Sequence, residues 1–266
     1  MRHHLVDTFA DDRFAGNPAA VAPVPAFPPV DRMQRIAHRI GVPTTAFVVP
    51  AGPGEYRVRW FTPYKEINLC GHATVASARH LFELTENTGR TELRFVSDNG
   101  VLRAERVGDL IAIDLPAAPP TPAAPPPGLL AALGAEAVSC ALSSDDSLVE
   151  LASAAAVTAV RPDFAALGRL PFRGNIITAP GPDGVDFVSR AFFPSLGVDE
   201  DQVCVSAHCK LTPFWARRLG RSRLSALQLS ERGGRLEVVD AGDRVRVLGT
   251  AVPRQGVPAE LGGLTR

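Results

Sequence analysis

The sequence predicts a mixed α/β (α+β) protein made of two similar half-domains, each with a mixed sheet wrapped on a central helix. Three observations favour this fold class: motifs that recur in the same order in both halves, a proline- and alanine-rich run between them, and apolar patterns typical of strands and of one long helix per half. We expect residues 1–117 to form the N-terminal half-domain and residues 118–266 the C-terminal one. A pseudo-twofold axis would then place a substrate cleft between them.

The repeat rests on two matched motifs. Arg59–Pro63 and Arg190–Pro194 both read Arg-x-Phe-x-Pro, and each is followed by a cysteine motif, Cys70–Ala73 in one half and Cys204–Ala207 in the other. Each cysteine stands where a helix is expected to begin. Because the motifs keep their order, we interpret the halves as duplicated units.

A third matched pattern predicts a β-hairpin in each half. The dipeptides Gly108-Asp109 and Gly242-Asp243 each separate two alternating apolar runs, and Gly-Asp is typical of tight turns between antiparallel strands. Between the halves, Pro116 to Gly128 is rich in proline and alanine, which predicts an extended connector and marks the boundary.

The remaining elements follow from local patterns. Helical periodicity is clearest from His72 to Leu84 and from Ser206 to Leu219. Segments rich in β-branched and aromatic residues predict strands. These segments are Leu5 to Phe9, Ala46 to Val49, Tyr56 to Phe61, Asn175 to Thr178 and Asp186 to Phe192.

Composition excludes several classes of function. The 266 residues include 28 basic and 28 acidic side chains, so there is no broad positive field of the kind that nucleic acids or anionic membranes attract. No apolar run approaches the roughly 20 residues of a membrane span, and no apolar signal region follows Met1, so we expect a cytoplasmic protein. Its four cysteines lack paired zinc spacing, so we expect free thiols and no metal.

The starts of the two predicted central helices form a candidate site for a small anion. Unpaired backbone amides and the positive end of the helix dipole attract a carboxylate without a dedicated Arg or Lys. Gly71 would let the backbone approach a ligand closely, and Thr74 or Ser206 would add hydroxyl donors. We therefore expect an acidic small-molecule substrate.

Several motifs in order resemble the phenazine biosynthesis isomerase-like family, over nearly the whole chain. The resemblance implies a fold similar to diaminopimelate epimerase, a homodimer, no cofactor, and an isomerase that moves a proton on a small carboxylate-bearing, cyclic metabolite of secondary metabolism such as antibiotic biosynthesis. The motifs are Phe14–Val21, Phe61–Pro63 with Glu66, Cys70–Thr74, and Glu200-Asp201 followed by Ser206-Ala207.

Carried over by position, the resemblance implies a set of site residues. His72 and Asp201 would be positioned for binding or for proton relay. Asn17, Gly71 and Ser206 would line the substrate site with them.

Two positions depart from the family pattern. Thr44 stands where the family motif has the glutamate that abstracts the proton, and a neutral hydroxyl is a poor base near pH 7. Val205 stands where a glycine begins the second central helix, which adds a side chain where close approach of backbone to ligand is expected. Glu66 is a possible substitute base, but we expect it to order the loop before Cys70.

Three hypotheses follow. In the first, the protein is a proton-transfer isomerase whose acid and base are Asp201, His72 or a group of the substrate. In the second, Cys70 and Cys204 act as opposed acid and base of an amino acid racemase or epimerase, because a helix N-terminus favours the thiolate. In the third, the protein without the glutamate binds a ligand, or promotes cyclisation by shape alone. His208 is expected to be structural.

Overall fold

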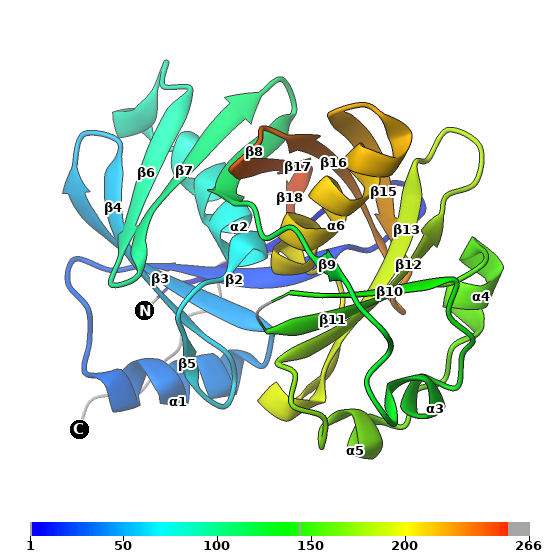
Figure 1. Cartoon of the computed structure of the whole chain (residues 1–266). Coiled ribbons are helices and arrows are strands. Elements are labelled where there is room, and N and C mark those ends of the chain that lie inside the picture. The colour runs from blue at the N-terminus through cyan, green and yellow to red at the C-terminus, as the bar shows by residue number, and fades with distance from the viewer. Residues whose placement is uncertain (1, 144, 255–266) are drawn as a thin grey trace. The chain divides into compact units, whose positions relative to one another are not determined.

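The structure is a computed structural model, and it describes residues 2–143 and 145–254. The chain forms two compact units, with the boundary after Asp114, close to the expected residue 117 (Figure 1). The segment from Leu248, which the sequence analysis assigns to the second half, belongs to the first unit. There, strand β18 (Ala251–Pro253) pairs antiparallel with β1 (His4–Thr8).

The first unit contains a mixed sheet in the order β18-β1-β2-β3-β4-β6-β7-β8, with the short β5 on β4. The β2–β3 and β4–β6 pairs are parallel and the others are antiparallel. The strands are β2 (Asn17–Pro23), β3 (Thr44–Gly52), β4 (Glu55–Phe61), β5 (Glu66–Ile67), β6 (Glu92–Ser97), β7 (Gly100–Val107) and β8 (Leu110–Pro116).

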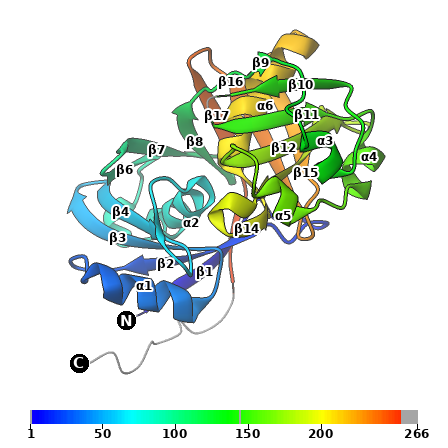
Figure 2. The same ribbon diagram turned by 60° about the horizontal axis from the view of Figure 1, so that its bottom comes forward.

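Helix α2 (Gly71–Phe82) is the central helix of this unit. It contacts six strands, β1, β2, β3, β6, β7 and β18, so the sheet wraps around it (Figure 2). A second helix, α1 (Val30–Ile40), packs on β3 and β4 through Met33, Ile36 and Ala37. A single 3-10 turn, η1 (Thr85–Asn87), follows α2.

The second unit contains a sheet with the same succession of pairings. Its order is β9-β10-β11-β12-β13-β15-β16-β17, with β14 on β13, and the parallel pairs are β11–β12 and β13–β15. The strands are β9 (Thr121–Pro122), β10 (Ser139–Leu142), β11 (Asp146–Glu150), β12 (Gly174–Pro180), β13 (Phe187–Phe193), β14 (Val198–Asp201), β15 (Arg223–Gln228), β16 (Gly234–Asp240) and β17 (Arg244–Gly249).

Helix α6 (Val205–Leu219) is the buried helix of the second unit. Its Trp215 stacks on Phe187 of β13 with ring centroids 5.8 Å apart, and the indole nitrogen donates to Thr178 Oγ1 on β12 at 2.9 Å. Helix α4 packs on β12 and β13. The short elements are α3 (Leu129–Leu133), α4 (Ala154–Ala159), α5 (Phe164–Leu167) and η2 (Pro194–Leu196).

The predicted elements and the repeat are present in these units. The five expected strands lie in β1, β3, β4, β12 and β13, and the two expected helices are α2 and α6. Hairpin β7–β8 turns at Gly108, and between β16 and β17 the amide of Ala241 donates to the carbonyl oxygen of Arg244 at 2.9 Å. Among the described residues, no helix combines the length and the apolar character needed to cross a membrane.

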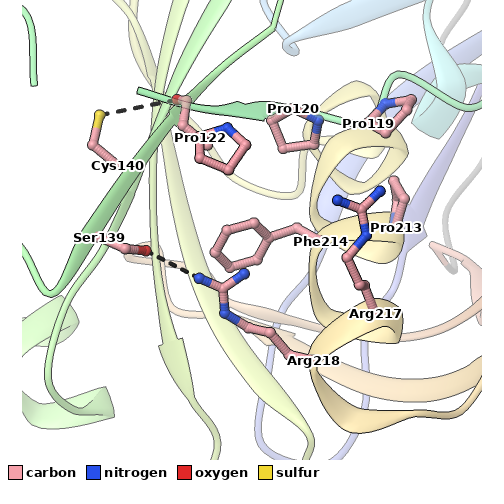
Figure 3. Close-up of a pocket in the computed structure, with 10 residues that line it drawn as sticks. Pro119, Pro120, Pro122, Ser139, Cys140, Pro213, Phe214, Arg217 and Arg218 are labelled. Carbon is pink, nitrogen blue, oxygen red and sulfur yellow. Dashed lines mark hydrogen bonds between the residues drawn. The ribbon is translucent and has the colours of Figure 1, made fainter. Parts of the chain in front are cut away.

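The proline-rich connector is docked on α6. Pro213 lies inside this helix and has no amide hydrogen, so the carbonyl oxygen of Cys209, four residues earlier, lacks its helical donor. The amide of Ala118 in the connector donates to that oxygen instead, at 3.0 Å. A cavity of about 60 Å³ remains between the connector, β10 and α6, where Phe214 lies beside the connector prolines and Arg218 donates to Ser139 Oγ at 3.2 Å (Figure 3).

Candidate functional site

An ion pair lies just before the start of the central helix in each unit. Arg59 on β4 forms two hydrogen bonds with Glu66 on β5, at 2.6 and 2.7 Å. Arg190 on β13 pairs in the same way with Glu200 on β14, with both bonds at 2.8 Å. Each glutamate stands four residues before a helix-starting cysteine. Both oxygens of Glu66 are thus used to order the loop, which agrees with the structural role expected for it.

The matched cysteines occupy equivalent positions. Cys70 is the N-cap of α2 and Cys204 is the N-cap of α6, both with extended backbone and neither helix with a side-chain cap. No acidic residue lies in the first turn of either helix. The positive end of each helix dipole is therefore not neutralised by its own first turn, which favours a bound anion. All four cysteines are free thiols, as predicted.

In the first unit, three candidate residues meet at Cys70. Its sulfur lies 3.4 Å from Thr44 Oγ1 and 3.4 Å from His72 Nδ1. Thr44 begins β3, and His72 is the second residue of α2, so the parallel β2–β3 pair and the helix start bring them together. All three side chains are buried, at 7% exposure or less. A thiol, an imidazole and a hydroxyl in contact are groups that can exchange protons with one another.

The other candidate residues of the first unit are Thr74, Gly71 and Asn17, and they differ in what they contact. Thr74, expected to offer its hydroxyl to substrate, is fully buried and donates to the carbonyl oxygen of Cys70 at 2.7 Å. It holds the helix start and does not point outward. Gly71 is the first residue of α2, and its backbone amide lies at the positive helix end. Asn17 begins β2, fully buried, and its carbonyl oxygen accepts from Thr8 Oγ1 at 2.9 Å.

In the second unit, Gln228 fixes the backbone around Cys204. The amide of Cys204 donates to Gln228 Oε1 at 2.8 Å, and Gln228 Nε2 donates to the carbonyl oxygen of Asp201 at 2.6 Å. One buried side chain thereby holds both ends of the turn that leads from β14 into α6. The sequence analysis did not single out Gln228, because nothing local distinguishes it from any other strand residue.

The thiol of Cys204 lies 3.3 Å from Ser206 Oγ. Burial raises the pKa of this thiol well above its ordinary value, and the nearby charge of Asp201 raises it further. The hydrogen bond with Ser206 and the charge of Arg173 act in the opposite direction. The free protein therefore holds Cys204 as a protonated thiol at neutral pH, with groups beside it that favour the thiolate.

A cluster of four charges, which we call the Arg173 cluster, lies next to Ser206. Asp146, with a fully buried side chain, accepts from Arg173 at 3.1 and 2.5 Å and pairs with Lys210 at 2.8 Å. Asp145 lies 2.9 Å from Arg173 and 3.5 Å from Lys210. Arg173 Nη2 also reaches Ser206 Oγ at 3.4 Å. The sequence analysis expected an anion site without any basic side chain, and it missed this cluster.

His208 and Val205 complete this helix start. His208 is fully buried, its Nδ1 lies 2.8 Å from the carbonyl oxygen of Cys204, and burial lowers its pKa to about 4. It is a neutral group that holds the first turn of α6, as the structural interpretation expects. Val205, which replaces a glycine of the family pattern, is the first helical residue and is buried.

Metal ligation has no obvious candidate here. Among residues 2–143 and 145–254, no group of three or more His, Cys, Asp or Glu side chains is arranged to hold an ion.

Comparison with known proteins identifies the family. The model of the phenazine biosynthesis-like protein family matches residues 6–256. An uncharacterized isomerase of Pseudomonas aeruginosa is 49% identical over 247 residues, which cover 92% of this chain and 93% of that protein. A crystal structure of a phenazine biosynthesis protein from Enterococcus faecalis is 41% identical, covers 95% of this chain and 96% of that one, and superposes with a TM-score of 0.89.

A more distant structure supports the fold alone. A probable proline racemase of Agrobacterium radiobacter is 10% identical, covers 98% of this chain and 94% of that one, and has a TM-score of 0.63. The fold is therefore the diaminopimelate epimerase-like fold that the sequence predicts. From the match along most of its length and the identity to its relatives, the chain belongs to the phenazine biosynthesis-like protein family.

Proposed function

We propose that the protein is a cofactor-independent isomerase that moves a proton on a carbon atom of a small, cyclic, carboxylate-bearing metabolite of secondary metabolism. The observation that carries this proposal is the contact of the Cys70 thiol with both His72 and Thr44 at the start of α2. The relatives that are named isomerases support isomerisation as the class of reaction.

In this proposal, the start of helix α2 binds the substrate carboxylate. A carboxylate at the N-terminus of α2 would accept from backbone amides such as that of Gly71, and the helix dipole would stabilise its charge by roughly 0.3–1 kcal/mol. The carbon next to a carboxylate is only weakly acidic, so removal of its proton requires a base close by and stabilisation of the charge that develops.

Cys70 and His72 supply that base in this proposal. A sulfur 3.4 Å from an imidazole nitrogen can pass its proton to the ring, which leaves a thiolate as the proton acceptor. The thiolate takes a proton from one carbon of the substrate, and the electron pair shifts along the conjugated system. The proton is then delivered to another carbon, so no atom is lost and no oxidant or cofactor is needed.

Thr44 explains why a cysteine serves as base in this chain. A carboxylate at this position would place a second negative charge about as close to the sulfur as Thr44 Oγ1 now lies, 3.4 Å away, and would suppress the thiolate. The hydroxyl of Thr44 is neutral and can donate to a thiolate. Replacement of the family glutamate by threonine is therefore consistent with transfer of the base role to Cys70.

A deuterium exchange experiment tests the proposal. Purified protein is incubated in deuterated water with small cyclic and acyclic carboxylic acids, including amino acids and dienes, and deuterium at carbon is followed by mass spectrometry. Cys70→Ser should slow incorporation by about 10²-fold or more, the usual contribution of a general base. Cys140→Ser, which changes a buried thiol far along the chain on β10, should leave it unchanged. Full activity of Cys70→Ser would refute the assignment.

A second experiment tests the role of Thr44 and needs no substrate. The rate of Cys70 alkylation by iodoacetamide is measured against pH by peptide mass spectrometry. Thr44→Glu should raise the pH midpoint by about one unit or more, whereas Thr44→Gln, of equal size but neutral, should shift it much less. Equal shifts in both variants would mean that the effect is steric.

The two-cysteine racemase or epimerase is the second candidate function. It is favoured by Cys204, which occupies the matching helix start and which burial keeps protonated, as an acid must be. In that case Cys204→Ser should abolish exchange as fully as Cys70→Ser does. If Asp201→Asn abolishes exchange while Cys204→Ser does not, Asp201 is the second group. No exchange with any compound, together with ligand-induced thermal stabilisation, would favour a binding protein or shape-based catalyst.

A further inference from the structure

Ser206 connects the Arg173 cluster to the Cys204 thiol. Its oxygen accepts from Arg173 Nη2 at 3.4 Å, and it lies 3.3 Å from Cys204 Sγ. A hydroxyl has one proton and two acceptor sites. While the oxygen accepts from the guanidinium, its own proton remains available for the sulfur, and the positive charge of Arg173 makes that proton a better donor.

Arg173 is held in this place by the strand starts of the second unit. Strands β11 and β12 are parallel, and Asp146 at the start of one is paired in register with Gly174 at the start of the other. Arg173 immediately precedes Gly174. A Cβ atom on Gly174 would lie 2.2 Å from the ring of Phe193 and 3.0 Å from Asp146 Oδ1, so only glycine permits this approach.

Among the residues of the first unit that the structure describes, no counterpart of this cluster is present. The register of the β3–β4 and β12–β13 pairs matches Phe47 opposite Arg59 with Ile177 opposite Arg190. By the same offset, Gly174 stands where the first unit has Thr44. In the first unit the cysteine thus has a hydroxyl partner on the strand, and in the second unit it has a hydroxyl on the helix that is connected to an arginine.

We propose that Arg173 is a positioning residue that keeps Ser206 as a hydrogen-bond donor to Cys204 Sγ and so prepares this thiol to carry negative charge during proton transfer. This role rests on the second candidate function above, in which Cys204 is the acid. Arg173 acts on the sulfur through Ser206, in addition to the direct effect of its charge.

We call the hydrogen-bonded series Arg173–Ser206–Cys204 the relay, and several charged or titratable groups surround it. The charge of Asp201 disfavours the thiolate of Cys204, and the charge of Arg173 favours it. The charge of Lys210 is balanced by the carboxylates that also hold Arg173. The groups that face the relay are Asp145, Asp146, Arg173, Asp201, His208 and Lys210.

The experiment measures the rate of Cys204 alkylation by iodoacetamide at one fixed, mildly alkaline pH, by peptide mass spectrometry, in the whole protein. Arg173→Met removes the donor, and Asp146 keeps its partner Lys210 at 2.8 Å, so the fold is retained. The Cys204 rate should fall about tenfold, the loss of thiolate that one pKa unit gives, and Arg173→Lys should restore only part of it because it lacks the planar fork. Cys70, read in the same sample, should not change.

A double-mutant cycle separates the relay from a direct charge effect. In a Ser206→Ala background, Arg173→Met should lower the Cys204 alkylation rate less than it does in the wild type, because only the direct effect of the charge remains once the connecting hydroxyl is absent. A fall of equal size in that background, or no fall in the single variant, would overturn the proposal. Arg223→Met, which removes an exposed pair with Glu237 in the same unit, is the matched control and should have no effect.

The same variants are then compared in the deuterium exchange assay. If Arg173 and Ser206 act as proposed, Arg173→Met should lower the exchange rate at neutral pH, and Arg223→Met should not. If wild-type protein exchanges no compound while the changes in alkylation rate hold, the proposed function fails and the relay stands. If exchange is normal in Arg173→Met and the Cys204 alkylation rate does not fall, only the relay fails.

Discussion

Removal of Asp146 is the sharpest test of the energetics in the second unit. Its carboxylate is fully buried and is the partner of Arg173 and of Lys210, whose side chain is only 6% exposed. Loss of one partner from a buried ion pair typically costs about 3–5 kcal/mol, because the remaining charge is left without compensation. Asp145 stays within 3.5 Å of Lys210 but is 45% exposed, so it compensates in part. We therefore expect Asp146→Ala to lower the free energy of unfolding by about 3 kcal/mol.

At about 3 °C per kcal/mol for a chain of this size, that loss corresponds to a fall in Tm of about 9 °C. Urea unfolding followed by tryptophan fluorescence measures it, because Trp215 lies in the affected unit and Trp60 in the other. Asp146→Asn, which keeps the volume and loses the charge, should give a smaller loss. Glu237→Ala at an exposed pair should change stability by less than about 0.5 kcal/mol. A loss below about 1 kcal/mol for Asp146→Ala would refute the reasoning.

Two further predictions concern backbone conformation and pH. Gly16→Ala should lower the free energy of unfolding, measured with urea, by about 2–3 kcal/mol, because Gly16 has φ +67° and an added Cβ would lie 2.2 Å from the carbonyl oxygen of Thr8. Gly52→Ala, with open space around the added Cβ, is the control. Burial lowers the pKa of His80 and of His208 from 6.5 to about 4. The unfolded chain therefore binds more protons between these values, so stability should fall as pH drops from about 6.5 towards 4 and stay level above that range. In His80→Phe, this slope should be reduced, and an unchanged slope would show that His80 does not contribute.

The starts of the central helices could be predicted because their signals are local and occur twice. Cys70 and Cys204 each stand four residues after a glutamate and follow a matched Arg-x-Phe-x-Pro motif, and both are N-caps in the structure. The contact of Cys70 with Thr44 joins positions 26 residues apart. The family pattern placed both residues in one site, although spacing alone would not have paired them.

The Arg173 cluster could not be predicted from local pattern, because its partners come from three separate segments. A usable signal was present, however: Asp146 and Arg173 each lie at the start of a strand, and the starts of neighbouring parallel strands meet at one edge. That inference requires knowledge of which strands are parallel neighbours. Helix α1 had a simpler signal, with Pro29 before it, Met33, Ile36, Ala37 and Ile40 along one face, and Gly41 after it.

The bond between Ala118 and the carbonyl oxygen of Cys209 makes the connector a fixed-length part of the second unit. Chains rich in proline and alanine are usually treated as spacers whose length can be changed freely. Here the amide of Ala117 also donates, to the carbonyl oxygen of Asp243 at 2.9 Å, so an insertion next to Ala118 on its N-terminal side would separate two docked residues. An insertion between Ala118 and β9 would force a choice between the bond to Cys209 and the pairing of β9 with β10. A protein engineer should therefore keep the length of the connector from Ala117 to β9 unchanged.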